Sequence, residues 1–364
     1  MRSKISLRGV LAAVLVALLG AFPDAQLVRA QQEGPQAPAP PAQSEPPRPP
    51  ESRPSPPPQS EAPQEPHAVI AVHANLVNVD AVVTDQDGNL VTGLKRENFR
   101  VFDNGQPQQV ATFAPTEAPI TIVVLMEFSK LWGGYFGYKA REWSYGFLHE
   151  LKPQDWVALK TFDLRTTIRV DFTQNKSEIE QAIYSLYFPD FSEANLFDAV
   201  YETVDQLRGV EGKKSILLLA TGFDTFSKHN LDQILRRLRE TDITIFCVGM
   251  GSEIDLYGNG GIAYAQAQNQ LNTFARMTGG YAWFPRFQAE MPAISGTVAS
   301  FLRNQYSVGF APSEAPDGHY HKLAVEVVDD QGNPLELVNK KGKKKKVVVI
   351  ARQGYMAAGS PAVD

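Results

Sequence analysis

The residues best suited to chemistry in this sequence follow a short apolar stretch. Ile122 to Met126 are apolar or β-branched, and Glu127, Phe128 and Ser129 come directly after them. Such a run is typical of a buried strand. In sheets of parallel strands, ligands are bound at the carboxyl ends of the strands. A carboxylate and a hydroxyl at this position therefore indicate a ligand or metal site, or a polar strand end that caps neighbouring backbone amides.

Other polar and aromatic residues are predicted to reach the same edge of the sheet. The stretch "SEANLFDAV" opens a helix, and Thr221 to Asp224 follow the apolar run "SILLLA". A glycine-rich loop at 132–138 carries aromatic residues that either contact a partner or fold back onto the core, and residues 188–191 offer a second candidate surface. The candidate ligand-binding residues are Glu127, Ser129, Trp132, Tyr135, Thr221 and Asp224.

The elements that position these residues alternate between strand and helix. Predicted strands are "ITIVVLM", "WVALKTF", "TTIRVDF", "SILLLATG", "ITIFCVGM" and "YAWF". Predicted helices are "YKAREWSYGFLHEL", "SEIEQAIYSLY", "NLFDAVYETVDQL", "NLDQILRRLRET", "QNQLNTFARMTG" and "MPAISGTVASFLRNQ". This order predicts an α/β fold over residues 116–305, with a doubly wound, mostly parallel, Rossmann-like sheet of roughly six strands.

Two β-rich segments flank this region, at 68–115 and 306–357. Both alternate apolar and polar residues with period two, and Asp87-Gly88, Asn104-Gly105 and Gly332 mark turns. We expect the two segments to pair into one small β-sandwich, with the middle of the chain inserted between them. Two independent small modules are the alternative.

The chain ends carry targeting and spacer signals. Residues 1–30 combine a basic start, the apolar stretch "VLAAVLVALLGAF" and a small-residue cleavage site, which predicts a signal peptide and no stable membrane span after its cleavage. A retained membrane anchor is the alternative. Residues 31–67 are expected to form a disordered linker, because 14 of the chain's 26 prolines lie within 33–66. Residues 358–364 form a short tail. The protein is therefore expected to be exported, and to be periplasmic, envelope-associated or secreted.

Charge and cysteine content exclude some classes of partner and stabilisation. The formal net charge of -5 gives no reason to expect nucleic acid, and the lysine run at 340–346 is expected to be a solvated strand end or loop. Cys247, the sole cysteine, lies in the apolar run "ITIFCVGM" and cannot form an internal disulfide. Stability must therefore come from the core.

These features together resemble a von Willebrand factor type A domain. The flanking segments narrow the likeness to exported bacterial proteins with a type-A-related domain, often found in acidobacterial genomes. There "VNVDAVVTDQDGNLVTGLKRENFRVFDNGQPQQVATF" resembles the usual lead-in, and "LRNQYSVGFAPSEAPDGHYHKLAVEV" with "ARQGYMA" resembles the usual exit. The resemblance covers about residues 68–357, and it implies a face of loops that binds ligands.

The resemblance also implies a metal-ion-dependent adhesion site, and this sequence departs from it. The family's Asp-x-Ser-x-Ser falls on Glu127, Ser129 and Leu131, its Thr on Ala194, and its third-loop Asp on Thr221. Mg²⁺ requires near-octahedral oxygen ligation at short distance. We therefore expect a degenerate site with no resident cofactor, and Lys130 as an ion-pair partner for Glu127. A weak Mg²⁺ site that keeps Glu127 and Ser129 is the alternative.

We expect an adhesion-like module that binds a protein or surface ligand, and not an enzyme. A structural component of an envelope assembly is one alternative, and a secreted hydrolase is another. The sequence contains no nucleophile elbow, phosphate loop or His-Glu-x-x-His motif. His319 and His321 could share one face of a strand as metal ligands, but a solvated hairpin is expected there.

Overall fold

The computed structural model describes residues 76–115, 119–132, 144, 146–186, 191–250, 261–314, 317–338, 342 and 344–357. The predicted signal peptide, linker and tail lie outside these residues, as do Tyr135 and residues 188–190, and the side chain of Trp132 is not described either. The chain divides into two compact units, Met1–Val69 and Ile70–Asp364, and all described residues belong to the second.

A central six-stranded sheet confirms the predicted α/β fold. Its strand order is β10-β9-β8-β5-β6-β7, and all neighbours are parallel except β7, which is antiparallel to β6. The strands are β5 (Ile120–Glu127), β6 (Trp156–Phe162), β7 (Thr166–Thr173), β8 (Lys213–Ala220), β9 (Thr244–Gly249) and β10 (Ala282–Trp283). Residues of β5 and β9 are buried on both faces, as central parallel strands require. Cys247 lies fully buried in β9, as predicted.

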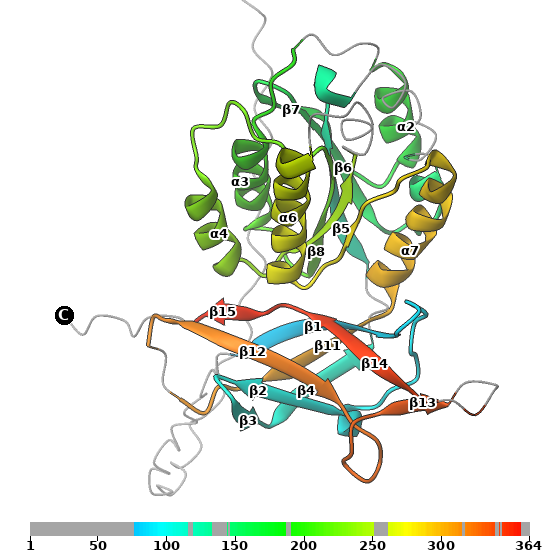
Figure 1. Cartoon of the computed structure of the whole chain (residues 1–364), viewed down its shortest axis with the longest axis vertical. Coiled ribbons are helices and arrows are strands. Elements are labelled where there is room, and N and C mark those ends of the chain that lie inside the picture. Colours follow the sequence, from blue (N-terminus) through cyan, green and yellow to red (C-terminus); the bar gives the residue numbers. More distant parts are fainter. Residues whose placement is uncertain are drawn as a thin grey trace, which may run out of the picture. The chain divides into compact units, whose positions relative to one another are not determined.

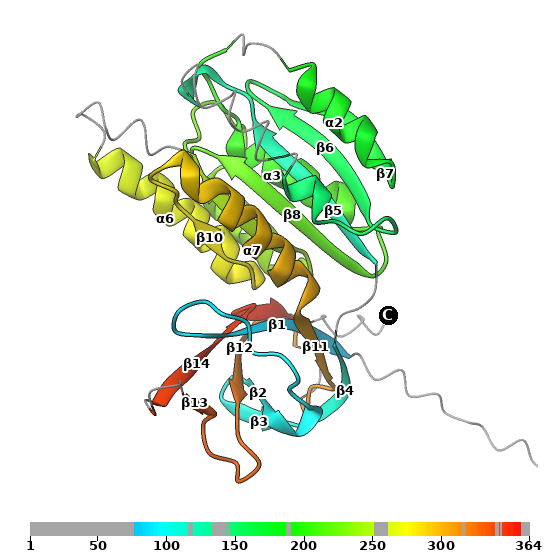
Figure 2. The ribbon, with the colours of Figure 1, turned by 90° about the vertical axis from the view of Figure 1, so that its right-hand side faces the viewer.

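Helices cover both faces of this sheet (Figures 1 and 2). They are α2 (Lys176–Tyr184), α3 (Leu196–Leu207), α4 (Leu231–Arg239), α6 (Gly261–Thr278) and α7 (Met291–Arg303). Ile122 and Val124 of β5 pack in one core cluster with side chains of α2 and α7. Val123 and Leu125 pack in a second cluster with α3, α4 and α6. The alternation along β5 therefore joins two apolar layers into one domain.

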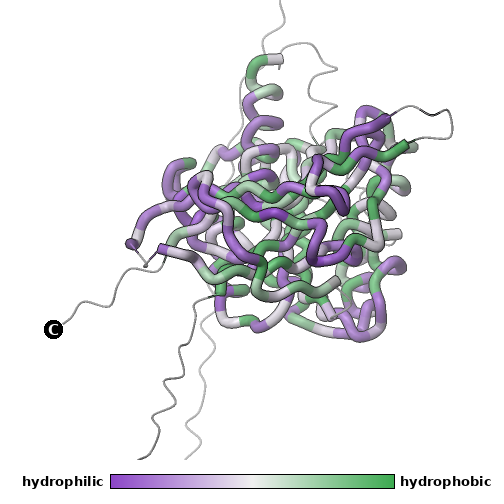
Figure 3. The backbone as a smooth tube through the Cα atoms, turned by 90° about the horizontal axis from the view of Figure 1, so that it is seen from below, coloured by the Kyte–Doolittle hydropathy of each residue, from purple (hydrophilic) through white to green (hydrophobic). Residues whose placement is uncertain are grey.

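Two antiparallel sheets form the remainder of the described chain. Their strand orders are β13-β14-β1-β11-β4 and β15-β12-β2-β3. The strands are β1 (Val77–Asp85), β2 (Phe99–Asp103), β3 (Gln106–Gln108), β4 (Val110–Pro115), β11 (Gln305–Phe310), β12 (Tyr320–Val327), β13 (Glu336–Val338), β14 (Lys344–Ala351) and β15 (Gly354–Met356). Apolar and polar stretches follow one another along the backbone (Figure 3), and apolar side chains of β1, β2, β4, β11, β12, β14 and β15 share one core cluster.

The two β-rich segments pair with each other, as predicted. β1 lies between β11 and β14, and β12 pairs with β2, so each sheet contains strands from both ends of the chain. Neither segment has its own complete sheet. The α/β region is thus inserted into a β fold that closes only when both ends of the chain are present.

The turns agree with the sequence in one place and differ in another. Asn104 and Gly105 both have positive φ, 48° and 82°, and join β2 to β3 in the expected two-residue turn. The turn predicted at Asp87-Gly88 does not lead into a second strand. After it, the chain forms only an isolated β-bridge between Thr84 and Leu90, so the predicted hairpin was too long. There the Asp85 carboxylate accepts hydrogen bonds from the backbone amides two and four residues later, which stabilises the turn without a second strand.

Three short 3₁₀ helices complete the fold: η1 (Arg96–Asn98), η2 (Lys130–Trp132) and η3 (Gln288–Glu290). Within the residues described above, no helix is long and apolar enough to cross a membrane.

Candidate functional site

The carboxyl group of Glu127 lies at the end of β5, in the middle of the sheet, and is fully buried. Its Oε1 accepts a hydrogen bond from Ser129 Oγ at 2.6 Å. Its Oε2 accepts two more from Thr221, from the backbone N–H at 2.7 Å and from the hydroxyl at 2.8 Å. The structure therefore brings these three predicted residues together. Each is at most 1% exposed, and their role in ligand binding stays a prediction.

Backbone hydrogen bonds tie the loop after β5 to its neighbours. The N–H of Phe128 donates to the Phe162 carbonyl at 2.7 Å, and that of Lys130 donates to the Phe191 carbonyl at 2.8 Å. The Ser129 hydroxyl also accepts from the Leu131 N–H. Lys130 is exposed, whereas Glu127 is buried, and the predicted ion pair between them stays a prediction. The loop is therefore fixed by main-chain contacts.

Asp224 braces the start of α3. Its Oδ1 accepts from the Phe197 N–H at 3.0 Å and from the Ser227 hydroxyl at 2.5 Å. Burial raises the pKa of Asp224 above its ordinary value, although both hydrogen bonds oppose the shift. This candidate residue is thus engaged with α3 and its own loop, and the described contacts do not join it to Glu127.

A second carboxylate, Asp198, holds the other end of the loop between β8 and α4, and the sequence analysis did not predict it. Asp198 accepts from the backbone amides of Lys228 and His229, at 2.9 and 3.0 Å, and its Oδ1 lies 2.7 Å from His229 Nδ1. The His229 ring stacks on Tyr201 with 4.1 Å between centroids. Burial tends to raise the pKa of Asp198, but the hydrogen bonds outweigh it and hold the pKa below its ordinary value.

Large apolar side chains are exposed near the loops that Glu127, Asp198 and Asp224 hold in place. They are Phe191 before α3, Phe226 between β8 and α4, Ile262 at the start of α6 and Phe287 between β10 and α7. Their exposed fractions are 39%, 58%, 81% and 71%. All four lie at the carboxyl-end edge of the sheet, since Phe191, Phe226 and Phe287 precede helices that return from that edge and Ile262 lies in the first turn of another such helix. Residues 188–191 were predicted as a surface, but the other three were missed. Their signal is a single large apolar residue in a polar or glycine-rich loop.

The family model of the von Willebrand factor type A domain matches residues 122–282. This range runs from β5 to β10 and includes all of the loops just described. Residues 122–282 form a von Willebrand factor type A domain. Curated proteins provide no match to this chain.

Solved structures of type A domains show a remote likeness. A von Willebrand factor type A protein from Catenulispora acidiphila is 10% identical, with a TM-score of 0.41, and the match covers 77% of this chain and 75% of that one. The vWF domain of the type V pili tip protein Mfa5 from Porphyromonas gingivalis is 12% identical with a TM-score of 0.41. That match covers 51% of this chain and 95% of that one. At these values the likeness carries no argument about function.

Two of the positions that the resemblance assigns to metal ligands carry apolar residues, Leu131 and Ala194. Ala194 is fully buried and Leu131 is half-buried, and neither side chain carries an oxygen. In the part of the chain that the structure describes, no group of three His, Cys, Asp or Glu side chains is placed to hold a metal ion. One buried carboxyl and two hydroxyl groups remain at the position that the resemblance assigns to the metal.

Proposed function

We propose that this protein is an exported interaction module, and not an enzyme, that binds a protein ligand through the carboxyl-end loops of its type A domain without a metal ion. The observation that carries the proposal is the carboxyl group of Glu127, which accepts hydrogen bonds from Ser129 and Thr221 on both of its oxygens. Export rests on the predicted signal peptide, with the periplasm, the envelope or the exterior as the destination.

The polar groups at the end of β5 do not fit Mg²⁺. The ion needs near-octahedral oxygen ligation at about 2.1 Å and gives up its water reluctantly. The carboxyl oxygens of Glu127 instead accept internal donors, and Leu131 and Ala194 supply no oxygen side chain. The same hydrogen bonds connect the loop after β5 to the loop after β8, which is the connection that a shared ion would otherwise make.

The loop face has the character of a protein-binding surface. Phe226 lies on a loop that Asp198 and Asp224 hold at both ends through backbone and side-chain hydrogen bonds. Loops that are rigid before binding lose little conformational entropy on association. Aromatic residues, Phe included, are enriched at the cores of protein interfaces. Phe191, Phe226 and Phe287 are exposed residues of this type.

Site-specific photo-cross-linking in the native envelope tests the proposal. A cross-linking amino acid at Phe226 should capture a discrete partner, and the same amino acid at Ile168 is the matched control, because Ile168 is 53% exposed on the edge strand β7. Addition of Phe191→Asp should abolish capture, and EDTA should leave it unchanged. Equal capture from both positions would overturn the loop face as the binding surface. Loss of capture in EDTA would overturn metal independence.

A calorimetric titration of the full chain with Mg²⁺ and Mn²⁺ tests metal independence without the partner. We expect no saturable heat up to millimolar ion. Saturable heat in the parent that disappears in Glu127→Ala would show a working ion site and contradict the proposal.

A structural role in an envelope assembly is a second candidate function. The observation that favours it is that β12 and β14 of the β-sandwich each have part of one backbone edge without a partner strand among the strands described. Neither strand belongs to the type A loops.

A further inference from the structure

The β-sandwich has a slot between β12 and β14 where strand pairing is incomplete. β14 pairs with β1 over Val347–Ala351, but on its other side it pairs only with β13, over residues 344–346. β12 pairs with β15 only over residues 320–322. Among the strands described, none pairs with the outer edges of Ala324–Glu326 and Val347–Ile350. Two backbone edges therefore face a common gap.

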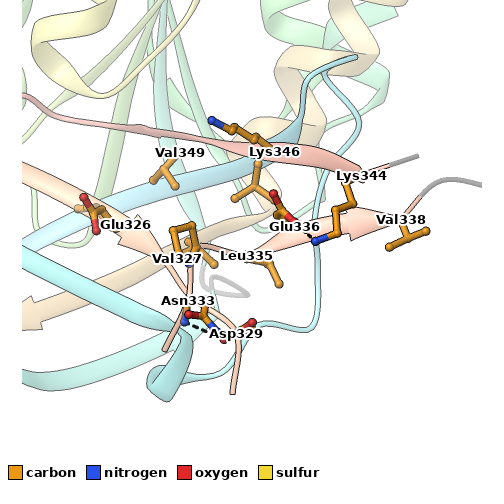
Figure 4. A pocket seen from close by; sticks show the side chains of 13 residues that line it. Glu326, Val327, Asp329, Asn333, Leu335, Glu336, Val338, Lys344, Lys346 and Val349 are labelled. Carbon is orange, nitrogen blue, oxygen red and sulfur yellow. Dashed lines mark hydrogen bonds and ion pairs between the residues drawn. The ribbon is translucent and has the colours of Figure 1, made fainter. Parts of the chain in front are cut away.

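The slot is lined by apolar side chains that belong to the sandwich core but stay half-exposed. They are Val325 of β12, Leu335 before β13, and Val347 and Val349 of β14, and the slot is also lined by Val327 of β12, which is buried. The slot has a volume of about 960 Å³ and shares Val325 and Val349 with an adjoining pocket of about 460 Å³. Figure 4 shows Val327, Leu335 and Val349 around it. Additional apolar side chains placed there would complete the core on this side.

The free edge of β12 carries one charged residue, Glu326, and the lysines of β14 lie at one end of the slot. Lys344 forms an ion pair with Glu336 at 2.7 Å, and Lys345 forms one with Asp87. Residues 347–350, Val-Val-Val-Ile, carry no charge. Natural proteins blunt exposed strand edges with charges, prolines or bulges, and an apolar edge without them is a template for another strand.

We propose that residues 68–75 of a second copy of this chain, "AVIAVHAN", insert into the slot as an additional strand. This segment has strand-forming apolar residues, no proline and no Lys, Arg, Asp or Glu, and it directly follows the proline-rich stretch. Because β strands advance about 3.3 Å per residue, its eight residues span roughly 26 Å, enough to follow both free edges. Ile70 and Val72, which share one face of such a strand, supply the side chains that the slot lacks.

The register of β1 indicates that the inserted segment comes from a second copy and not from the same chain. Ala81 of β1 faces Ala351 of β14, and Leu76, 44% exposed, lies five residues beyond this point. A chain returning from Leu76 to the slot must cover about 17 Å, which uses roughly five residues. Those residues would be 71–75, so too little of the apolar segment would remain to fill the slot.

A labelled peptide of residues 67–76 tests the slot directly. The receptor is the full chain with Ile70→Asp, because this variant cannot donate its own segment but keeps the slot. Fluorescence anisotropy should show saturable binding. Val349→Asp should weaken it about tenfold or more, since a carboxylate would be buried against the strand. Val348→Asp is the matched control, because Val348 is 44% exposed on the same strand and does not line the slot.

A peptide that carries Val72→Asp gives the same test without altering the protein fold. It should bind the receptor at least about tenfold more weakly than the parent peptide. Absence of saturable binding, or equal binding of both peptides, would overturn the proposal.

Disulfide trapping then identifies the donor chain. Cys247 is the sole cysteine of the sequence and is fully buried, so Val72→Cys with Val325→Cys supplies the thiols that can react. We expect disulfide-linked dimers and larger species on a non-reducing gel, and none with Val72→Cys and Val348→Cys. A disulfide confined to one chain in a protein that sediments as a monomer would overturn the second copy as donor. Phe226→Asp should leave this assembly unchanged, which separates the result from the proposed loop-face function.

Discussion

At the scale of single residues, the buried carboxyl group of Glu127 joins the loop after β5 to the loop after β8. Glu127→Ala removes the acceptor for the Thr221 N–H, the Thr221 hydroxyl and the Ser129 hydroxyl. We expect the free energy of unfolding to fall by about 3 kcal/mol, because buried donors then lose their partner. Chemical denaturation measures this loss.

Two further variants make the Glu127 measurement specific. Glu127→Gln keeps an acceptor oxygen and should cost about half as much as the alanine variant. Glu211→Ala removes an exposed carboxylate and should change stability by less than about 0.5 kcal/mol. An alanine variant as stable as the parent would show that the three hydrogen bonds contribute nothing to the loop structure.

The residue types at this site were predictable, but their partners were not. Glu127, Ser129 and Thr221 could be assigned to one sheet edge because parallel strands place their carboxyl ends together. That Asp224 braces α3, and that Asp198 holds the loop of Phe226, depends on side-chain directions across residues about thirty positions apart. Periodicity carries no information on such directions.

At the scale of elements, Gly222 is required by the approach of α6 to the loop after β8. Its φ is +89°, and an added Cβ would lie 2.6 Å from the Ala267 carbonyl oxygen, which belongs to α6. We expect Gly222→Ala to lower the free energy of unfolding by about 2 kcal/mol through strain and contact with the helix backbone. Gly146→Ala is the control, because its site is open and helical, and it should be neutral or stabilising by up to about 1 kcal/mol. Thermal unfolding of both variants checks the difference, and similar melting temperatures would contradict it.

The elements with a clear apolar period were predicted closely. β6 matches its predicted residues, and α3 and α7 each begin within one residue of prediction. α6 begins at Gly261, seven residues earlier than predicted, because its first turns contain alanine and glutamine that favour a helix without forming an apolar stripe. The prediction of a second strand after Asp87-Gly88 was wrong because the sequence alternates there without a strand partner. Alternation alone cannot show whether pairing continues beyond the Thr84–Leu90 bridge.

At the scale of the whole molecule, a buried polar cluster joins the two ends of the β-sandwich. Asp103 in β2 comes from the N-terminal segment, and His321 in β12 and Tyr355 in β15 come from the C-terminal one. His321 Nδ1 lies 2.9 Å from Asp103 Oδ1, its Nε2 lies 3.2 Å from Asp317, and the Tyr355 hydroxyl donates to Asp103 at 2.8 Å. The solvated hairpin expected around His321 was wrong, because this side chain is only 3% exposed.

This cluster predicts that the protein is more stable at mildly acidic pH than at alkaline pH. Burial lowers the pKa of His321, but the hydrogen bonds and charges of Asp103 and Asp317 outweigh it and raise the pKa above its ordinary value near 6.5. The folded state therefore binds the proton more tightly than the unfolded state does. The resulting stability is fully present below about pH 6.5 and is lost as the pH rises through the folded-state pKa of His321.

Chemical denaturation across this range should show the decline in the parent, whereas His321→Gln should be less stable at low pH and should lack the decline. The exposed His319 offers the control, since His319→Gln should keep the parent's pH dependence. An unchanged pH profile in His321→Gln would show that the cluster does not couple protonation to the closure of the two chain ends.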